Sequence, residues 1–248
     1  MSIPPTIVSC ARTGWKWQWN QLMNGLAPAD KAGNFCRKPS QAQNAILPNP
    51  SDLLNRSIDE FPILVIGRSC PWAHRTWLMY ELRNLSSSLN LLIAYPDYKG
   101  GLWKISPGWK GCQSLLELYK FFNSPPTHRA TVPALFDPKQ SIKEKPHLLG
   151  NESAQLIEIL NQWPAQDDVP NFCPKELQQD INTWQLLIQE SINNGVYKCG
   201  FARNQEAYNK ASEELFHSLK TIEESLSNKG PWLCGDKLTL ADIRLFPT

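Results

Sequence analysis

Apolar and polar positions follow two different periods along this chain, and the change of period divides it into segments. Residues 61–67 form a short continuous apolar run, which is typical of a strand buried on both faces of a sheet. Residues 71–85 then carry apolar side chains at helical spacing, and a second apolar run extends from Leu89 to Tyr95. This order predicts a strand, a helix and a parallel strand, joined by a right-handed crossover.

The pattern continues with a third strand and a second helix. A loop rich in Gly, Trp and Lys precedes Thr131–Asp137, a predicted strand that contains Val132 and Pro133. A helix is then predicted from about Ser153 to Trp163. This order of elements, with a proline entering a strand, is that of a thioredoxin-like α/β domain, which we assign to residues 59–164.

Beyond a linker rich in Pro and Asp, the chain is predicted to be an all-helical domain from 174 to 248. Gly195 and Gly230 stand where helices are expected to end. Thr239 and Asp242 form a capping box, which marks the start of a further helix. The apolar stripes of the helical region are Leu177, Ile181, Trp184, Ile188 and Ile192, and then Ala207, Ala211, Leu215, Leu219, Ile222 and Leu226.

Residues 1–58 show weak periodicity and much Pro, Asn, Gln and Trp, so we interpret them as a wrapping extension. The alternation of Trp15, Trp17 and Trp19 is compatible with a short strand. We favour an apolar strap packed on a domain surface.

Composition narrows the class of protein. A hydrophobic fraction of 42% and a net charge of +2 fit a globular protein and argue against nucleic-acid or anionic-membrane partners. The chain has no apolar run of about 20 residues and no signal-like N-terminus. Its seven cysteines lack C-x-x-C spacing and its four histidines stand far apart, so no metal site is predicted. Unpaired cysteines indicate a reduced, cytoplasmic protein.

Candidate chemistry lies where the first strand meets the first helix. Cys70 is the predicted N-cap, and Pro71 is the first helical residue, where its missing N–H costs nothing. Free N–H groups and the positive end of the helix dipole favour the thiolate and are expected to lower the cysteine pKa by about one unit or more. Ala73 stands where a resolving cysteine would, so we expect a monothiol site. The alternative is an inert, small apolar cysteine.

Two further features suit a peptide ligand. Val132-Pro133, often a cis bond in such a place, would leave backbone groups free to pair with an extended peptide, although an edge-strand proline explains it too. Ser153 and backbone N–H groups at a helix start suit a carboxylate, and Glu152 suits an amino group, but a plain helix cap is the alternative. Together with Cys70, these features suit glutathione, which has two carboxylates, an amine and a thiol.

The run Ser69–Thr76 resembles the signature of the glutathionyl-hydroquinone reductases, also called Xi-class glutathione transferases. The similarity extends from about residue 30 to the end of the chain. It implies a thioredoxin-like domain followed by an all-helical glutathione-transferase domain. The other segments that carry the resemblance are Gly33–Ser40, Gly101–Trp103, Val132–Pro133, Asn151–Ser153, Asn194–Ala202, Gln205–Tyr208 and Leu238–Phe246.

The resemblance implies a chemical role for two residues. Cys70 would attack the sulfur of a glutathionyl-hydroquinone and expel the hydroquinone, and a second glutathione would regenerate the thiol. Tyr197 would face the aromatic substrate and stabilise or protonate the leaving group. A tyrosine that only packs between helices is the alternative. We interpret His74 and Arg75 as packing or surface charge, because consecutive helix positions do not share a face.

The resemblance also implies how glutathione, the co-substrate, would be held. Val132, followed by Pro133, would pair through its backbone with the cysteinyl unit. Glu152 and Ser153 would hold the γ-glutamyl end, and Trp103 would cover the tripeptide.

The family continues beyond Thr248 with more helices, so we expect the helical domain to be incomplete. Two alternatives follow from this expectation. The chain is an omega-like reductase of mixed disulfides or dehydroascorbate, or it is an inactive glutathione-binding module. The resemblance allows a homodimer.

Overall fold

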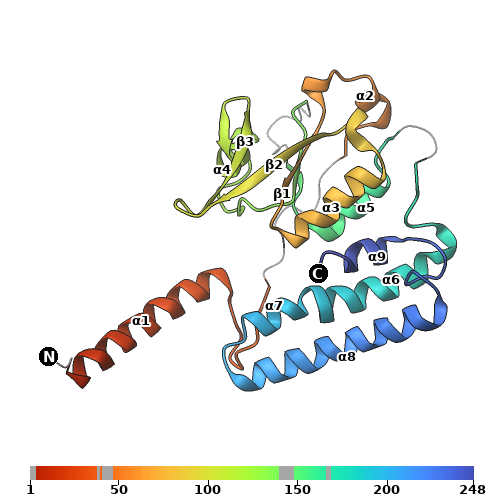
Figure 1. The fold of residues 1–248 in the computed structure, drawn as a ribbon. Helices are drawn as coiled ribbons and strands as arrows, with labels where there is room; N and C mark the ends of the chain where they lie inside the picture. The colour runs from red at the N-terminus through yellow and green to blue at the C-terminus, as the bar shows by residue number, and fades with distance from the viewer. Residues whose placement is uncertain (1–3, 38–39, 41–46, 140–147, 166–168) are drawn as a thin grey trace. The chain divides into compact units, whose positions relative to one another are not determined.

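The chain forms two compact units in the computed structural model, and each is described by itself (Figure 1). One combines Met1–Pro39 with Leu187–Glu224, and the other combines Ser40–Leu186 with Ser225–Thr248. Within the described part of the chain, no helix is long and apolar enough to cross a membrane. The structure describes residues 4–37, 40, 47–139, 148–165 and 169–248.

A six-stranded mixed sheet, in the order β4-β3-β2-β1-β5-β6, is the centre of the second unit. β1 is buried along its whole length, as its continuous apolar run predicts. It pairs in parallel with β2 and antiparallel with β5. The strands are β1 (Ile63–Gly67), β2 (Asn90–Asp97), β3 (Leu102–Trp109), β4 (Cys112–Ser114), β5 (Ala134–Phe136) and β6 (Leu148–Gly150).

The helix between β1 and β2 confirms the predicted β-α-β unit, and the arrangement is the predicted thioredoxin-like fold (Figure 1). α3 packs against β1 and α5, α9 packs against both helices, and α4 packs against β3 and β4. The helices of this unit are α2 (Pro50–Leu54), η1 (Ile58–Glu60), α3 (Pro71–Leu82), η2 (Leu85–Ser87), α4 (Leu115–Phe121), α5 (Ser153–Asn161), η3 (Lys175–Leu177), α6 (Gln178–Leu187) and α9 (Leu240–Leu245).

The predicted loop between the second strand and Thr131 is wrong, because β3, β4 and α4 occupy that stretch. β3 lies near the sheet edge with most of its side chains exposed, so it lacks the apolar run that marks a buried strand. α4 is a short helix that begins with a capping box between Ser114 and Glu117. The predicted strand Thr131–Asp137 is also shortened to β5.

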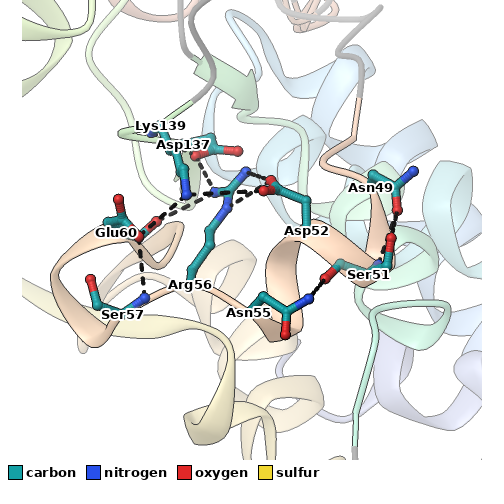
Figure 2. Close-up of polar contacts among 9 residues, drawn as sticks. All are labelled: Asn49, Ser51, Asp52, Asn55, Arg56, Ser57, Glu60, Asp137 and Lys139. Carbon is teal, nitrogen blue, oxygen red and sulfur yellow. Dashed lines mark hydrogen bonds and ion pairs between the residues drawn. The ribbon is translucent and has the colours of Figure 1, made fainter.

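A buried ion pair fastens the segment before β1 to the end of β5. Arg56, which follows α2, donates from Nη1 to Asp137 Oδ1 at 2.6 Å, and both side chains are buried (Figure 2). Its Nη2 donates to Asp52 Oδ2 at 2.8 Å. Burial alone would lower the pKa of Arg56, but the two carboxylates outweigh it and raise that pKa. This cluster fixes the strand that begins just after Val132-Pro133.

The first unit contains a long helix where the tryptophan alternation suggested a strand or a strap. Trp15, Trp17 and Trp19 all lie in α1, and Trp15 is 72% exposed, so both interpretations are wrong. Three alternating residues are too few to separate the two periods, and Pro5 at the first helical turn suits a helix start. The helices of this unit are α1 (Pro5–Leu26), the π-helical η4 (Ile188–Asn193), α7 (Gly195–Gly200) and most of α8 (Gln205–Lys229).

The two glycines predicted to end helices behave differently. Gly230 directly follows α8 with a φ of +122°, which confirms the prediction there. Gly195 begins α7 instead of ending a helix, so that prediction is wrong. A Cβ built on Gly195 would make an ordinary contact of 3.4 Å with the Leu215 side chain of α8, so packing does not require a glycine at this position.

Candidate active site

Cys70 caps the helix that follows β1, as predicted. Its backbone is extended, Pro71 is the first helical residue, and its carbonyl accepts from the N–H groups of Ala73 and His74 at 3.1 and 3.0 Å. Its own N–H donates to Gly67, the last residue of β1, at 2.9 Å. The half-buried thiol therefore lies at the N-terminus of a twelve-residue helix, on a turn anchored to the central strand.

The Val132-Pro133 peptide lies beside this thiol. The bond is cis, and the Cys70 Sγ lies 3.6 Å from the Val132 carbonyl oxygen. The sheet explains this approach, because β1 and β5 pair antiparallel and so the end of β1 meets the start of β5.

Trp103 lies against the same turn. A Cβ built on Gly67 would stand 2.7 Å from Trp103 Cζ3 and 3.0 Å from Val132 Cγ2. The ring therefore packs directly on the backbone of Gly67, a position where any larger side chain would displace it. Trp103 comes from β3, where it pairs with Pro96 of β2.

Glu152 and Ser153 stand at the start of α5, as predicted. Glu152 is the N-cap, and its carboxylate accepts from the Ala154 N–H at 3.4 Å. Ser153 is the first helical residue and is 2% exposed. Arg75 of α3 donates from Nη1 to the Ser153 hydroxyl at 3.4 Å. This contact joins the helix that carries Cys70 to the predicted γ-glutamyl site.

A second connection runs through Tyr119, a residue that sequence reasoning missed. Its hydroxyl donates to the Thr131 carbonyl at 3.0 Å and accepts from Asn151 Nδ2 at 3.2 Å. Burial raises the pKa of Tyr119, so the phenol keeps its proton. The segment before Val132 is thereby tied to the segment before Glu152. No signal pointed to Tyr119, because it lies in α4, which was predicted as loop.

The sequence predicts packing or surface charge for Arg75 and His74, and burial excludes surface charge for Arg75. Arg75 is 1% exposed, and its guanidinium lies 4.5 Å from the centre of the Trp72 ring. His74 is half-buried, with its ring 5.9 Å from that of Phe246. Ala73, at the place of a resolving cysteine, is buried.

Tyr197 lies in the first unit, in α7, and is described there alone. Its ring stacks on Phe201 at 6.1 Å, and Phe201 lies 5.4 Å from Phe35. Cys70, Trp103, Val132, Pro133, Glu152 and Ser153 all belong to the second unit.

The other thiols have different surroundings. Burial raises the pKa of Cys112, Cys173, Cys199 and Cys234, so these remain thiols at neutral pH. Cys10 and Cys36 are exposed. Within the described ranges, no three His, Cys, Asp or Glu side chains gather as a metal site would require. The geometry at Cys70 suits thiol–disulfide exchange with an extended peptide held at Val132.

Comparison with known proteins agrees with this geometry. Residues 69–163 match the N-terminal domain model of the glutathione S-transferases, and residues 172–248 match the C-terminal domain model. Glutathionyl-hydroquinone reductase PcpF of Sphingobium chlorophenolicum is 37% identical over 229 residues, which cover 87% of this chain and 68% of PcpF. This chain belongs to the Xi-class glutathione transferases.

Two other members of this class are also similar. Glutathionyl-hydroquinone reductase YqjG of Escherichia coli is 34% identical over 197 residues, which cover 75% of this chain and 58% of YqjG. The crystal structure of glutathione-S-transferase Xi from Phanerochaete chrysosporium has a TM-score of 0.75 at 29% identity, covering 89% of this chain and 72% of that one. YqjG has also been solved with glutathione bound. This transferase therefore spans 58% to 72% of these relatives.

Proposed function

We propose that this transferase is a glutathione-dependent reductase that cleaves glutathionyl-hydroquinones through a mixed disulfide at Cys70. The observation that carries the proposal is the position of the Cys70 thiol, which caps α3 and lies 3.6 Å from the carbonyl oxygen before a cis proline. The absence of a cysteine at Ala73 favours a second sulfur from solution. The relatives named glutathionyl-hydroquinone reductases support the substrate class.

In the first half-reaction the Cys70 thiolate attacks the sulfur of the glutathionyl group. A disulfide forms between Cys70 and glutathione, and the bond between that sulfur and the aromatic carbon breaks. Its electron pair passes to the ring carbon, which takes a proton and leaves as the hydroquinone. We propose the Tyr197 hydroxyl as the group that stabilises or protonates this carbon system.

In the second half-reaction the thiolate of another glutathione attacks the mixed disulfide. It takes the glutathionyl sulfur, and Cys70 leaves as a thiolate. The sum is two-electron reduction of the glutathionyl-hydroquinone, with glutathione oxidised to its disulfide. A monothiol site suffices for this cycle, because glutathione supplies the resolving sulfur.

We propose that glutathione lies along the turn between β1 and α3. The Val132 backbone, held by cis Pro133, pairs with the cysteinyl unit, and Trp103 covers the tripeptide. Glu152 and Ser153, at the start of α5, take the amine and carboxylate of the γ-glutamyl end.

The proposed division of labour follows the predicted domains. Residues 59–164 bind glutathione, residues 174–248 contribute to the site for the aromatic substrate, and residues 1–58 are an extension. The reaction needs a thiol pool that keeps Cys70 reduced, so we propose the cytoplasm as its location.

The proposal is tested by steady-state release of menadiol from glutathionyl-menadiol in the presence of glutathione. We expect release by the wild type, loss of release in Cys70→Ser, and full release in the matched control Cys36→Ser, which changes an exposed thiol. Release that survives Cys70→Ser would contradict the proposal. If the folded wild type releases no menadiol but still reduces a mixed disulfide, the substrates are disulfides and not glutathionyl-hydroquinones.

A further inference from the structure

Arg75 is a buried cation whose position calls for an explanation. It lies on α3 one turn beyond Cys70 and is 1% exposed. Burying a guanidinium costs free energy unless its N–H groups and its charge are compensated. Two contacts supply part of this compensation, namely the face of Trp72 at 4.5 Å and the hydroxyl of Ser153 at 3.4 Å from Nη1.

Two other buried arginines of the second unit have different partners. Arg83 donates to the carbonyl oxygens of Leu160, Trp163 and Pro170, which hold the linker after α5. Arg244 of α9 pairs with Glu158 at 3.6 Å. Arg75 likewise links two helices, α3 and α5, and its partner in α5 is Ser153, a residue of the proposed glutathione site.

The direction of this hydrogen bond decides what Ser153 can do. A serine hydroxyl has one donor and two acceptor sites. Because Nη1–H of Arg75 donates to the oxygen, an acceptor site is used and the O–H of Ser153 is left as a donor. A polarised donor at the first residue of a nine-residue helix is suited to a carboxylate.

We propose that Arg75 is a positioning residue for glutathione, which fixes Ser153 as a hydrogen-bond donor to the γ-glutamyl carboxylate. This inference rests on the proposed function, because it assigns the carboxylate partner at α5. The guanidinium also contributes positive charge from within a low-dielectric region, where attraction to an anion is weakly screened.

The chemistry of the arginine matters for this role. A guanidinium is planar, so it can stack on Trp72 and direct an N–H toward Ser153 at the same time. A lysine ammonium keeps the charge but not the plane. We therefore expect Arg75→Lys to recover only part of the affinity lost in Arg75→Met.

The experiment measures the dissociation constant of reduced glutathione by calorimetry for the wild type, Arg75→Met, Ser153→Ala and the double variant. Each single variant is expected to weaken binding about tenfold, the loss typical of a charge-assisted hydrogen bond. The double variant is expected to lose much less affinity than the product of the two single losses, because both variants remove one shared contact. At saturating glutathione the maximal rate should change much less than the KM for glutathione.

Arg83→Met is the matched control, since it removes another buried guanidinium, at the C-cap of the same helix. It should lower the unfolding midpoint and leave the glutathione dissociation constant within about twofold. If Arg75→Met does not fold, Arg75→Lys and Ser153→Ala carry the test. Unchanged affinity in Arg75→Lys and Arg75→Met, or losses that multiply in the double variant, would overturn the inference.

The outcomes also separate this inference from the proposed function. If the wild type binds glutathione and releases menadiol, but substitution of Arg75 leaves the glutathione affinity unchanged, only the positioning role of Arg75 is contradicted. If the wild type binds glutathione, and this binding depends on Arg75 as expected, but no menadiol is released, only the proposed substrate class is contradicted. A wild type that does not bind glutathione overturns both.

Discussion

The Cys70 sulfur lies 3.6 Å from the carbonyl oxygen of Val132, although 62 positions separate the two residues in the chain. The register of the sheet produces this contact. Val65 of β1 pairs with Ala134 of β5, so the turn that follows β1 meets the peptide that precedes β5. A shift of one residue in this pairing would turn the β5 side chains to the opposite face and move the peptide away from the turn, so the contact depends on this register.

Gly67 is expected to tolerate no side chain. In Gly67→Ala the new Cβ would stand 2.7 Å from the Trp103 ring and force the ring or the strand to move. Such overpacking should lower the free energy of unfolding by about 1–3 kcal/mol, measured by urea denaturation, and shift the tryptophan fluorescence. Gly14→Ala is the control, because nothing lies within 4 Å of its Cβ. It should not lower stability, and equal losses in both variants would contradict the packing.

Asp137 is expected to be one of the most sensitive positions for stability. Asp137→Asn leaves Arg56 buried beside a neutral amide, and breaking a buried pair costs about 3–5 kcal/mol. Asp52→Asn removes the other, half-exposed partner of Arg56 and should cost much less. Urea denaturation of the two variants measures the difference. Equal costs would show that burial does not govern this cluster.

The cysteines are expected to differ in their rate of alkylation. In a Cys10→Ser/Cys36→Ser background, iodoacetamide at pH 6 should label Cys70 first. Burial raises the pKa of the other four thiols, which holds them protonated and unreactive. Peptide mapping after short labelling times identifies the site. Earlier labelling of any of those four would contradict the prediction.

Glu117 is expected to contribute to the acid sensitivity of stability. Its carboxylate accepts from the N–H groups of Gln113 and Ser114 at 2.6 and 3.0 Å, which lowers its pKa below the ordinary 4.5. A carboxyl with a lowered pKa in the folded state stabilises above its unfolded pKa, and this contribution is lost as pH falls through the folded pKa.

The Glu117→Gln variant measures that contribution. Its free energy of unfolding should fall less steeply than that of the wild type as pH decreases below 4.5. Urea denaturation at several values of pH gives both slopes. Identical slopes would show that the capping box does not depend on the charge of Glu117.

The elements that were predicted correctly are those that the local sequence determines. β1 has a continuous apolar run, α3 has Cys70-Pro71 at its start, and the Thr239–Asp242 capping box forms with the Thr239 N–H donating to the carboxylate at 2.9 Å. Each of these signals lies within a few residues of the element that it specifies.

The features that were missed depend on contacts between distant segments. The largely exposed strand β3 is held by pairing with β2 and β4, and its own residue pattern gives no sign of a strand. The positions of Arg75 and Tyr119 follow from the packing of α3 against α5 and from the unpredicted α4. The tryptophans of α1 were misread for a different reason: three alternating residues are too few to distinguish the period of a strand from that of a helix.

The most direct test of the account is a single turnover without free glutathione. Mixing the transferase with glutathionyl-menadiol should release one menadiol per active site and leave one glutathionyl group on Cys70, located by mass spectrometry of the peptides. Added glutathione should then remove the group. A glutathionyl group on another cysteine, or menadiol released without any adduct, would contradict the central role of Cys70.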